Sequence, residues 1–173
     1  MLEKITCDSL KSCSLNNLLE ILPEVEYELG KRYYEGKETK KNMEKAFFYF
    51  NAAAEHGYVA SQWMIGFMYF NGFGIDQNYT KAREIFEKLE EQGIELEETQ
   101  FWLGELYEYG RGTKKDYKKA CEWYEKASKQ GNPVAKIRIA YLYENKIDID
   151  DIPSELKDFR LYRKLHKEHE EDD

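Results

Sequence analysis

Residues 99–131 read TQFWLGELYEYGRGTKKDYKKACEWYEKASKQG, and this stretch decides the fold because earlier stretches of the chain repeat its pattern. Gly30, Gly66 and Gly104 form one column of the repetition, spaced 36 and 38 residues apart. All eleven glycines fall in four such columns, of which the other three are Gly36, Gly72 and Gly110; Gly57, Gly93 and Gly131; and Gly74 and Gly112. Self-similarity with a period of roughly 20 to 50 residues is typical of a solenoid of stacked units.

The first segment of each repeat has the pattern of a helix. In residues 99–110, Leu103 and Tyr107 are four positions apart and share one helix face. The matching segments are VEYELGKRYYEG (25–36), SQWMIGFMYFNG (61–72) and AKIRIAYLYENK (135–146). A glycine inside a helix costs about 1 kcal/mol relative to alanine. The recurring glycine therefore predicts a close approach by a neighbouring helix, and Ala140 is the smallest replacement available in the last segment.

The second segment of each repeat predicts another helix. It begins after a residue that is favoured as an N-cap, because a side-chain oxygen can accept a hydrogen bond from the first turn. It ends at a glycine, which is favoured in the left-handed conformation that closes a helix. The N-caps are Asn42, Asn78 and Asp116, and the closing glycines are Gly57, Gly93 and Gly131. Each unit is therefore expected to be a hairpin of two antiparallel helices.

The repeats predict an all-α fold, a solenoid with three full hairpins and a degenerate fourth. The hairpins are expected at residues 25–60, 61–98 and 99–135, with the first helix of the fourth at 136–145. Residues 1–24 are expected to be an N-terminal capping segment whose apolar stretch Leu15–Leu22 stops near Pro23. Residues 146–173 are expected to form a capping helix after Ser154 and an acidic tail, since terminal repeats need a polar outer face.

The third unit resembles the Sel1-like repeat, a relative of the tetratricopeptide repeat with the usual pattern LGxxYxxGxGxxxDxxKAxxWYxxAAxxG. A lysine–alanine pair recurs at Lys45-Ala46, Lys81-Ala82 and Lys119-Ala120. The resemblance covers residues 25–145 and implies a right-handed α-α superhelix and an adaptor-like protein that binds other proteins. Two positions depart from the pattern: Glu38 replaces the second loop glycine in the first unit, and Lys146 stands where a glycine belongs in the last.

Composition narrows the choice of partners and compartments. The net charge of −8 disfavours nucleic acid, which requires a basic surface, and suits a basic protein. No stretch approaches 18 apolar residues and no secretory signal is recognisable, so we expect a cytoplasmic protein without a membrane span. Cys7, Cys13 and Cys121 are an odd set without metal-ligand spacing, which favours three free thiols, although a Cys7–Cys13 bridge remains an alternative.

The candidate binding residues lie on the first helices, in two columns that vary from repeat to repeat. The columns flank the recurring glycine, are three positions apart and so share a face, which lines the concave groove in related repeat folds. They are Glu28, Met64, Trp102 and Arg138, and Lys31, Phe67, Glu105 and Tyr141. Aromatic anchors among charges are typical of interface hot spots. The alternative is that Trp102 and Phe67 pack between repeats. A neighbouring column that is apolar in every unit is expected to be core: Tyr27, Trp63, Phe101 and Ile137.

Other chemistry has little support in the sequence. No nucleophile–base or paired-carboxylate arrangement stands out, so we expect no catalytic activity and no cofactor. His166 and His169 are too few for a metal site, and His56 is expected at a helix C-terminus. The loop Gly110–Lys114 lacks the preceding strand of a phosphate loop.

Three protein-binding roles remain open at this stage. One is a bacterial immunity protein that neutralises a toxin, possible partners being basic toxin domains. Another is a general adaptor or scaffold, and the third is an effector that a pathogen delivers into a host cell. The oligomeric state is not determined by these patterns.

Overall fold

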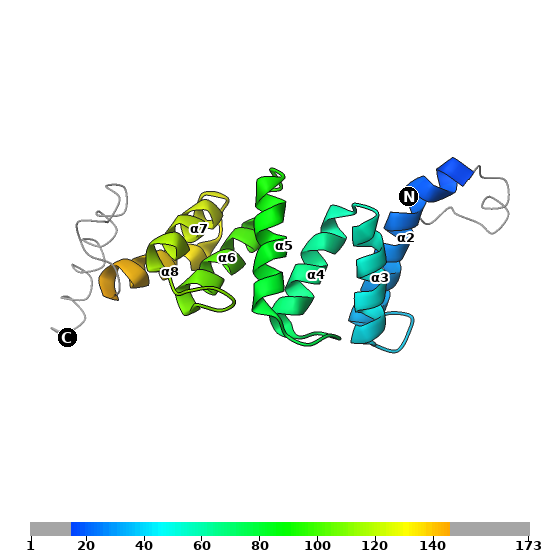
Figure 1. Ribbon diagram of the computed structural model, residues 1–173, viewed down its shortest axis with the longest axis horizontal. Helices are drawn as coiled ribbons and strands as arrows, with labels where there is room; N and C mark the ends of the chain where they lie inside the picture. The colour runs from blue at the N-terminus through cyan, green and yellow to red at the C-terminus, as the bar shows by residue number, and fades with distance from the viewer. Residues whose placement is uncertain (1–14, 146–173) are drawn as a thin grey trace, which may run out of the picture. The chain divides into compact units, whose positions relative to one another are not determined.

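The computed structural model describes residues 15–145, with side chains from residue 20 onward. These residues form seven helices and no strand (Figure 1). The helices are α2 (Leu15–Glu35), α3 (Met43–Glu55), α4 (Val59–Asn71), α5 (Tyr79–Glu91), α6 (Glu97–Tyr109), α7 (Tyr117–Lys129) and α8 (Pro133–Asn145). None of these helices is long and apolar enough to cross a membrane. The expected capping helix and acidic tail lie outside the described residues.

The helices pair as the repeat predicts. The chain divides into two compact units at Gln92 and Gly93, so that α2–α5 belong to unit 1 and α6–α8 to unit 2. In unit 1, α2 packs on α3 and α4 on α5, with α3 joining the two hairpins; in unit 2, α6 packs on α7, and α7 on α8. The three predicted hairpins and the first helix of the fourth are thus present, and the all-α prediction is confirmed.

Both ends of the second helices follow from the residues named above. The backbone N–H groups of Lys45, Lys81 and Lys119 donate to the side chains of Asn42, Asn78 and Asp116, at 2.8, 2.9 and 3.0 Å respectively. Each of these bonds satisfies a donor that the first helical turn would otherwise leave open. At the other end, Gly57, Gly93 and Gly131 have φ values of 82°, 75° and 111°, as the closing position requires. His56 is the C-cap of α3, as expected.

The recurring glycines lie where two helices of one hairpin meet. A Cβ atom built on Gly30 would lie 2.7 Å from the ring of Phe50, and on Gly66 2.5 Å from the ring of Phe86. On Gly104 it would lie 2.5 Å from the ring of Tyr124. Carbon atoms normally approach no closer than about 3.5 Å. The predicted close approach is therefore confirmed in all three repeats.

The lysine–alanine pair joins the second helix to the first. Ala46, Ala82 and Ala120 are completely buried. The preceding lysine carries its ammonium group over the tyrosine of the first helix, at 5.2 Å for Lys45 and Tyr33, 5.1 Å for Lys81 and Tyr69, and 4.3 Å for Lys119 and Tyr107. Such a contact contributes about 0.5–1 kcal/mol at an exposed site. The two adjacent residues of the motif therefore both contact the first helix: the alanine packs in the core, and the lysine lies over the tyrosine ring.

The second loop glycine of the second repeat, Gly74, is a steric requirement. Gly74 has φ 70°, and a Cβ there would collide with the backbone carbonyl of Met43 at the start of the preceding α3. Glu38 holds the same position in the first repeat with φ 60°. Among the described residues no hairpin precedes the first repeat, so only the cost of the left-handed backbone applies to Glu38.

One prediction about the N-terminus is wrong. Helix α2 continues through Pro23 and runs without interruption into the first repeat. Proline removes one hydrogen bond from a helix interior, but its fixed φ is itself helical, so a helix with enough packing can continue through it. Ile21, Leu22 and Val25 on either side of Pro23 are half-buried, which provides that packing. The expected boundary at residue 24 therefore falls within a helix.

Candidate protein-binding surface

The eight candidate residues lie on four first helices, two on each. Glu28 and Lys31 are on α2 and Met64 and Phe67 on α4, in unit 1; Trp102 and Glu105 are on α6 and Arg138 and Tyr141 on α8, in unit 2. The members of each pair are three positions apart, so they share a helix face as predicted. The two units present separate halves of the candidate surface.

The charged half of unit 1 is exposed. Lys31 is exposed, and Glu28 accepts a hydrogen bond from Arg32 one turn further along α2, with 3.4 Å between Nε and Oε1. Arg32 also forms an ion pair of 2.8 Å with Glu38 in the following loop. Exposed pairs of this kind contribute about 0–1 kcal/mol, so they hold side chains in place more than they stabilise the fold.

The apolar half of unit 1 is divided between core and surface. Met64 packs against the core cluster of Ala46, Phe50, Ile65 and Met68. Phe67 is half-buried and stacks on Trp63 of its own helix, with ring centroids 5.3 Å apart and planes 10° apart. Met64 therefore belongs partly to the core, whereas Phe67 forms part of an aromatic platform on α4.

In unit 2, Arg138 connects α8 to α6. Its guanidinium lies 3.6 Å from Glu105 and 3.5 Å from Glu108, and Nη2 donates to the Tyr109 hydroxyl at 2.5 Å. Glu105 and Arg138 therefore pair with each other across two different helices, a contact that the repeat pattern did not predict. Burial raises the pKa of Glu105, and the nearby Arg138 partly opposes that rise.

Glu108 is the residue of this cluster that sequence reasoning missed. It is buried, at 4% exposure, and accepts a hydrogen bond of 2.7 Å from the Tyr124 hydroxyl. Burial, together with Glu108, raises the pKa of Tyr124, because both disfavour a phenolate. Comparison of the complete repeats contains a signal: the first and second carry Tyr34 and Phe70 in place of Glu108, and phenylalanines, Phe50 and Phe86, in place of Tyr124. In the third repeat, the carboxylate of Glu108 and the hydroxyl of Tyr124 therefore replace apolar or aromatic groups of the other complete repeats and bond to each other.

The aromatic residues of unit 2 remain accessible. Trp102 is half-buried, with its ring 5.6 Å from that of Phe101 at 73°, and Tyr141 is 43% exposed. Neighbouring α8 residues Val134 and Ile137 are exposed as well, at 47% and 58%. Helix α8 therefore presents an apolar row that the earlier first helices lack.

The exposure of Ile137 contradicts its prediction as core. Tyr27 and Phe101, at equivalent positions, lie 5.6 and 5.5 Å from the rings of Phe50 and Tyr124 on the second helices of their own hairpins. Within residues 15–145 no second helix follows α8, so nothing equivalent covers Ile137. Tyr27 and Phe101 are half-buried against the core of complete hairpins, whereas Ile137, which has no second helix beside it in the described residues, is exposed.

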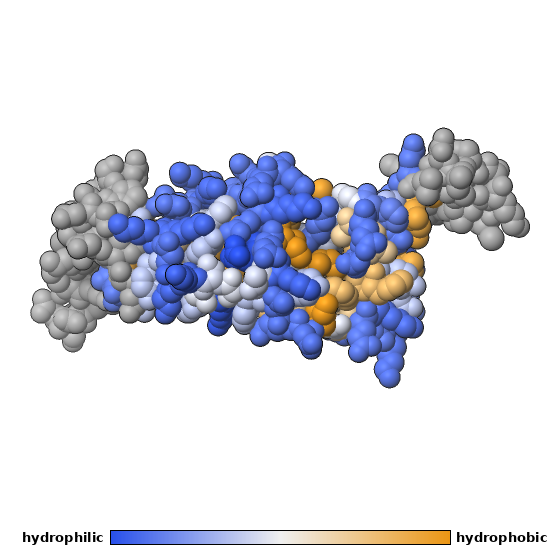
Figure 2. All heavy atoms as spheres, viewed as in Figure 1, coloured by the Kyte–Doolittle hydropathy of each residue, from blue (hydrophilic) through white to orange (hydrophobic). Residues whose placement is uncertain are grey.

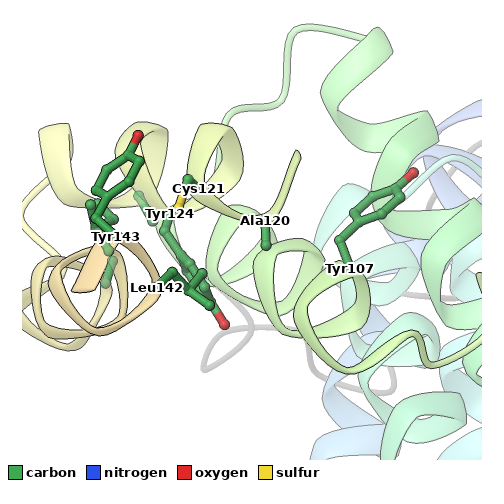
Figure 3. Close-up of a cluster of buried hydrophobic side chains, with 9 residues drawn as sticks. Tyr107, Ala120, Cys121, Tyr124, Leu142 and Tyr143 are labelled. Carbon is green, nitrogen blue, oxygen red and sulfur yellow. The ribbon is translucent and has the colours of Figure 1, made fainter. Parts of the chain in front are cut away.

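The remaining candidates within the described residues contribute no further site. His56 lies 2.9 Å from Glu26, which ties α3 to α2. Gly110 and Gly112 have φ 67° and form the hairpin loop of their repeat. Cys121 is buried as a free thiol among Tyr124, Leu142 and Tyr143 (Figure 3). No group of three or more potential metal ligands occurs in the described part of the chain. Cys7, Cys13, His166 and His169 lie outside it.

Comparison with known proteins identifies the family. The model of the Sel1 repeat family matches residues 23–58, 59–94 and 98–132. The chain belongs to the Sel1 repeat family. Proteins of this family are generally protein–protein interaction modules and typically scaffolds without catalytic activity. A search of curated proteins finds no match.

Two of the solved structures that are similar to the chain show the same fold. A Sel1 repeat protein from Oxalobacter formigenes is 30% identical, with a TM-score of 0.64 over 73% of this chain and 51% of that one. The chain therefore spans about half the length of that relative. The cysteine rich protein B of Helicobacter pylori is 21% identical, with a TM-score of 0.50 over 75% of this chain and 95% of that one, and supports the fold alone. Both agree with an all-α superhelical repeat fold.

Proposed function

We propose that this chain binds a basic protein partner through the exposed side chains of its first helices, and that it acts as an immunity protein that neutralises a toxin. The observation that carries the proposal is the set of aromatic side chains kept accessible beside charges on those helices. Phe67 in unit 1 and Trp102 and Tyr141 in unit 2 all retain exposed surface. Aromatic residues of this kind dominate the energy of protein interfaces.

Charge supports the choice of a basic partner. The chain carries a net charge of −8, so its field attracts cations and accelerates their association. Many toxins that need a dedicated inhibitor are basic nucleases, and an acidic binding module is suited to cover such a surface. A general adaptor or a delivered effector would use the same face with a different partner.

The proposal is tested by capture of a partner from the native host, followed by titration calorimetry with single variants. Trp102→Ala should weaken binding by about 2 kcal/mol, as expected for an aromatic hot spot. The matched control is Trp123→Ala, because Trp123 is also half-buried but lies on the second helix α7, with Lys126 4.0 Å above its ring. Binding should be unchanged in this control.

Charge reversal tests the basic partner separately. Glu28→Lys should slow association and reduce its dependence on salt, whereas Glu84→Lys on the second helix α5 should not. Glu105 is unsuitable because it is more buried than Glu28, and its replacement would break the contact with Arg138 that joins α6 to α8. Equal losses from Trp102→Ala and Trp123→Ala, or a partner that is acidic, would overturn the proposal. Toxin activity measured with and without the chain separates neutralisation from simple attachment.

A further inference from the structure

Unit 1 contains an open cavity of about 210 Å³ between α3, α4 and α5. Its apolar lining consists of Ala54, Ile65 and Ile85, and hydrophobic surface is visible over this part of the unit in Figure 2. Glu55 from α3 and Lys88 from α5 line it as charged residues. Small-molecule sites usually enclose about 300–1,000 Å³, so this cavity suits a single side chain better than a free ligand.

A side chain of suitable size lies on the same helix. Phe48 of α3 is 66% exposed, the largest exposure among the large hydrophobic residues described. Its ring lies 5.3 Å from Tyr49, which stacks in turn on Tyr33 of α2 at 5.6 Å. The other two repeats carry the exposed glutamates Glu84 and Glu122 at this position. The ring is therefore held on an aromatic base at a place where the repeat otherwise has a charge.

The position of Phe48 relative to the cavity is self-complementary. Phe48 precedes Asn51 by three residues, Ala54 follows it by three, and both Asn51 and Ala54 line the cavity. When two copies of one helix pack antiparallel about a two-fold axis, residues equally distant from the axis in sequence face each other. An axis at Asn51 therefore places Phe48 of each copy opposite Ala54 of the other.

We propose that α3 mediates a symmetric dimer of this chain, in which Phe48 of each copy enters the α3–α4–α5 cavity of the other. The surface carries one projecting ring and one cavity for it, as a two-fold contact requires. Glu55 and Lys88 also line the cavity, so each copy brings one acidic and one basic side chain to the contact. This surface belongs to unit 1 alone, and none of the eight candidate binding residues lines the cavity.

The first test is sedimentation of the full chain over a wide range of concentrations. The parent should dimerise, and Phe48→Glu, which installs the residue of the other repeats, should weaken the dimer at least about tenfold. Ala54→Met should do the same by filling the cavity from within. Val134→Glu is the matched control, since it removes an exposed apolar side chain from α8 and should leave the dimer intact. Thermal melts of each variant confirm that it remains folded.

Cross-linking tests the axis itself. With Cys7 and Cys13 replaced by serine, Asn51→Cys should form a disulfide between two copies under mild oxidation, and Glu122→Cys should not. A parent that is monomeric at every concentration, or a dimer that survives Phe48→Glu, overturns the proposal. A monomeric parent in which Phe48→Glu weakens a different protein partner assigns the surface to that partner and also overturns it. Trp102→Ala should leave the dimer unchanged, so this proposal fails independently of the proposed function.

Discussion

Replacing Gly104 by alanine adds one methyl group at the point where α6 and α7 are closest. That methyl would lie 2.5 Å from two ring carbons of Tyr124. The ring is completely buried, and its hydroxyl donates a 2.7 Å hydrogen bond to Glu108. It is therefore held at both ends and cannot turn aside, so either α6 must move or the hydrogen bond must lengthen.

Two opposing effects set the size of the change. Alanine is favoured over glycine inside a helix by about 1 kcal/mol. Overpacking a core typically costs about 1–3 kcal/mol, and the upper end applies here because the contact is short by about 1 Å. We therefore expect a net loss of about 1–2 kcal/mol in the free energy of unfolding. For a chain of this size that corresponds to a fall in Tm of roughly 2–8 °C.

Thermal and urea unfolding of Gly104→Ala, Tyr124→Ala and the double variant measure the effect. In the Tyr124→Ala background the obstructing ring is gone, so Gly104→Ala should become stabilising by about 1 kcal/mol. This change of sign distinguishes a local clash from general damage to α6. A Gly104→Ala variant that is as stable as the parent, or additive effects in the cycle, would refute the close-approach reasoning.

Three further predictions follow from other contacts. In urea unfolding, the Glu38→Gly variant should be about 1 kcal/mol more stable than the Glu38→Ala variant. Both variants lose the ion pair with Arg32, but only glycine relieves the left-handed backbone at φ 60°. Equal stabilities of the two variants would contradict this. Lys119→Met should cost about 0.5–1 kcal/mol by removing the cation over Tyr107, with Lys114→Met as the exposed control that should change nothing. Burial and the nearby Glu125 raise the pKa of Cys121 from 9.0 to about 12, so the folded state favours the neutral thiol. The stability that the folded state gains from a neutral Cys121 should be complete below pH 9.0 and should be lost as the pH rises toward about 12. Cys121→Ala should therefore make the free energy of unfolding less dependent on pH in this range. An unchanged pH dependence would contradict this prediction.

Part of the candidate surface was predictable because the helical period is regular. Residues three apart on one first helix must share a face, but the 3.6 Å contact between Glu105 and Arg138 joins two different helices and was not predicted. Their roles were not predictable, because a periodic pattern does not say whether a charge faces solvent or another charge. Ile137 illustrates the same limit. Its column is apolar throughout, but burial depends on a covering helix, which is lacking for Ile137 in the described residues.

The sequence by itself determined the hairpins, their capped ends and the close approach at the recurring glycines. These features depend on interactions within one repeat, so they occur in register in every copy and can be read from the columns. The tertiary structure alone decided the continuation of α2 through Pro23, the division of Met64 and Phe67 between core and surface, and the cluster of Glu108, Tyr124 and Arg138. These depend on which side chains from different helices meet, because the energy of a buried charge or ring is set by its neighbours in space rather than by its position in a repeat.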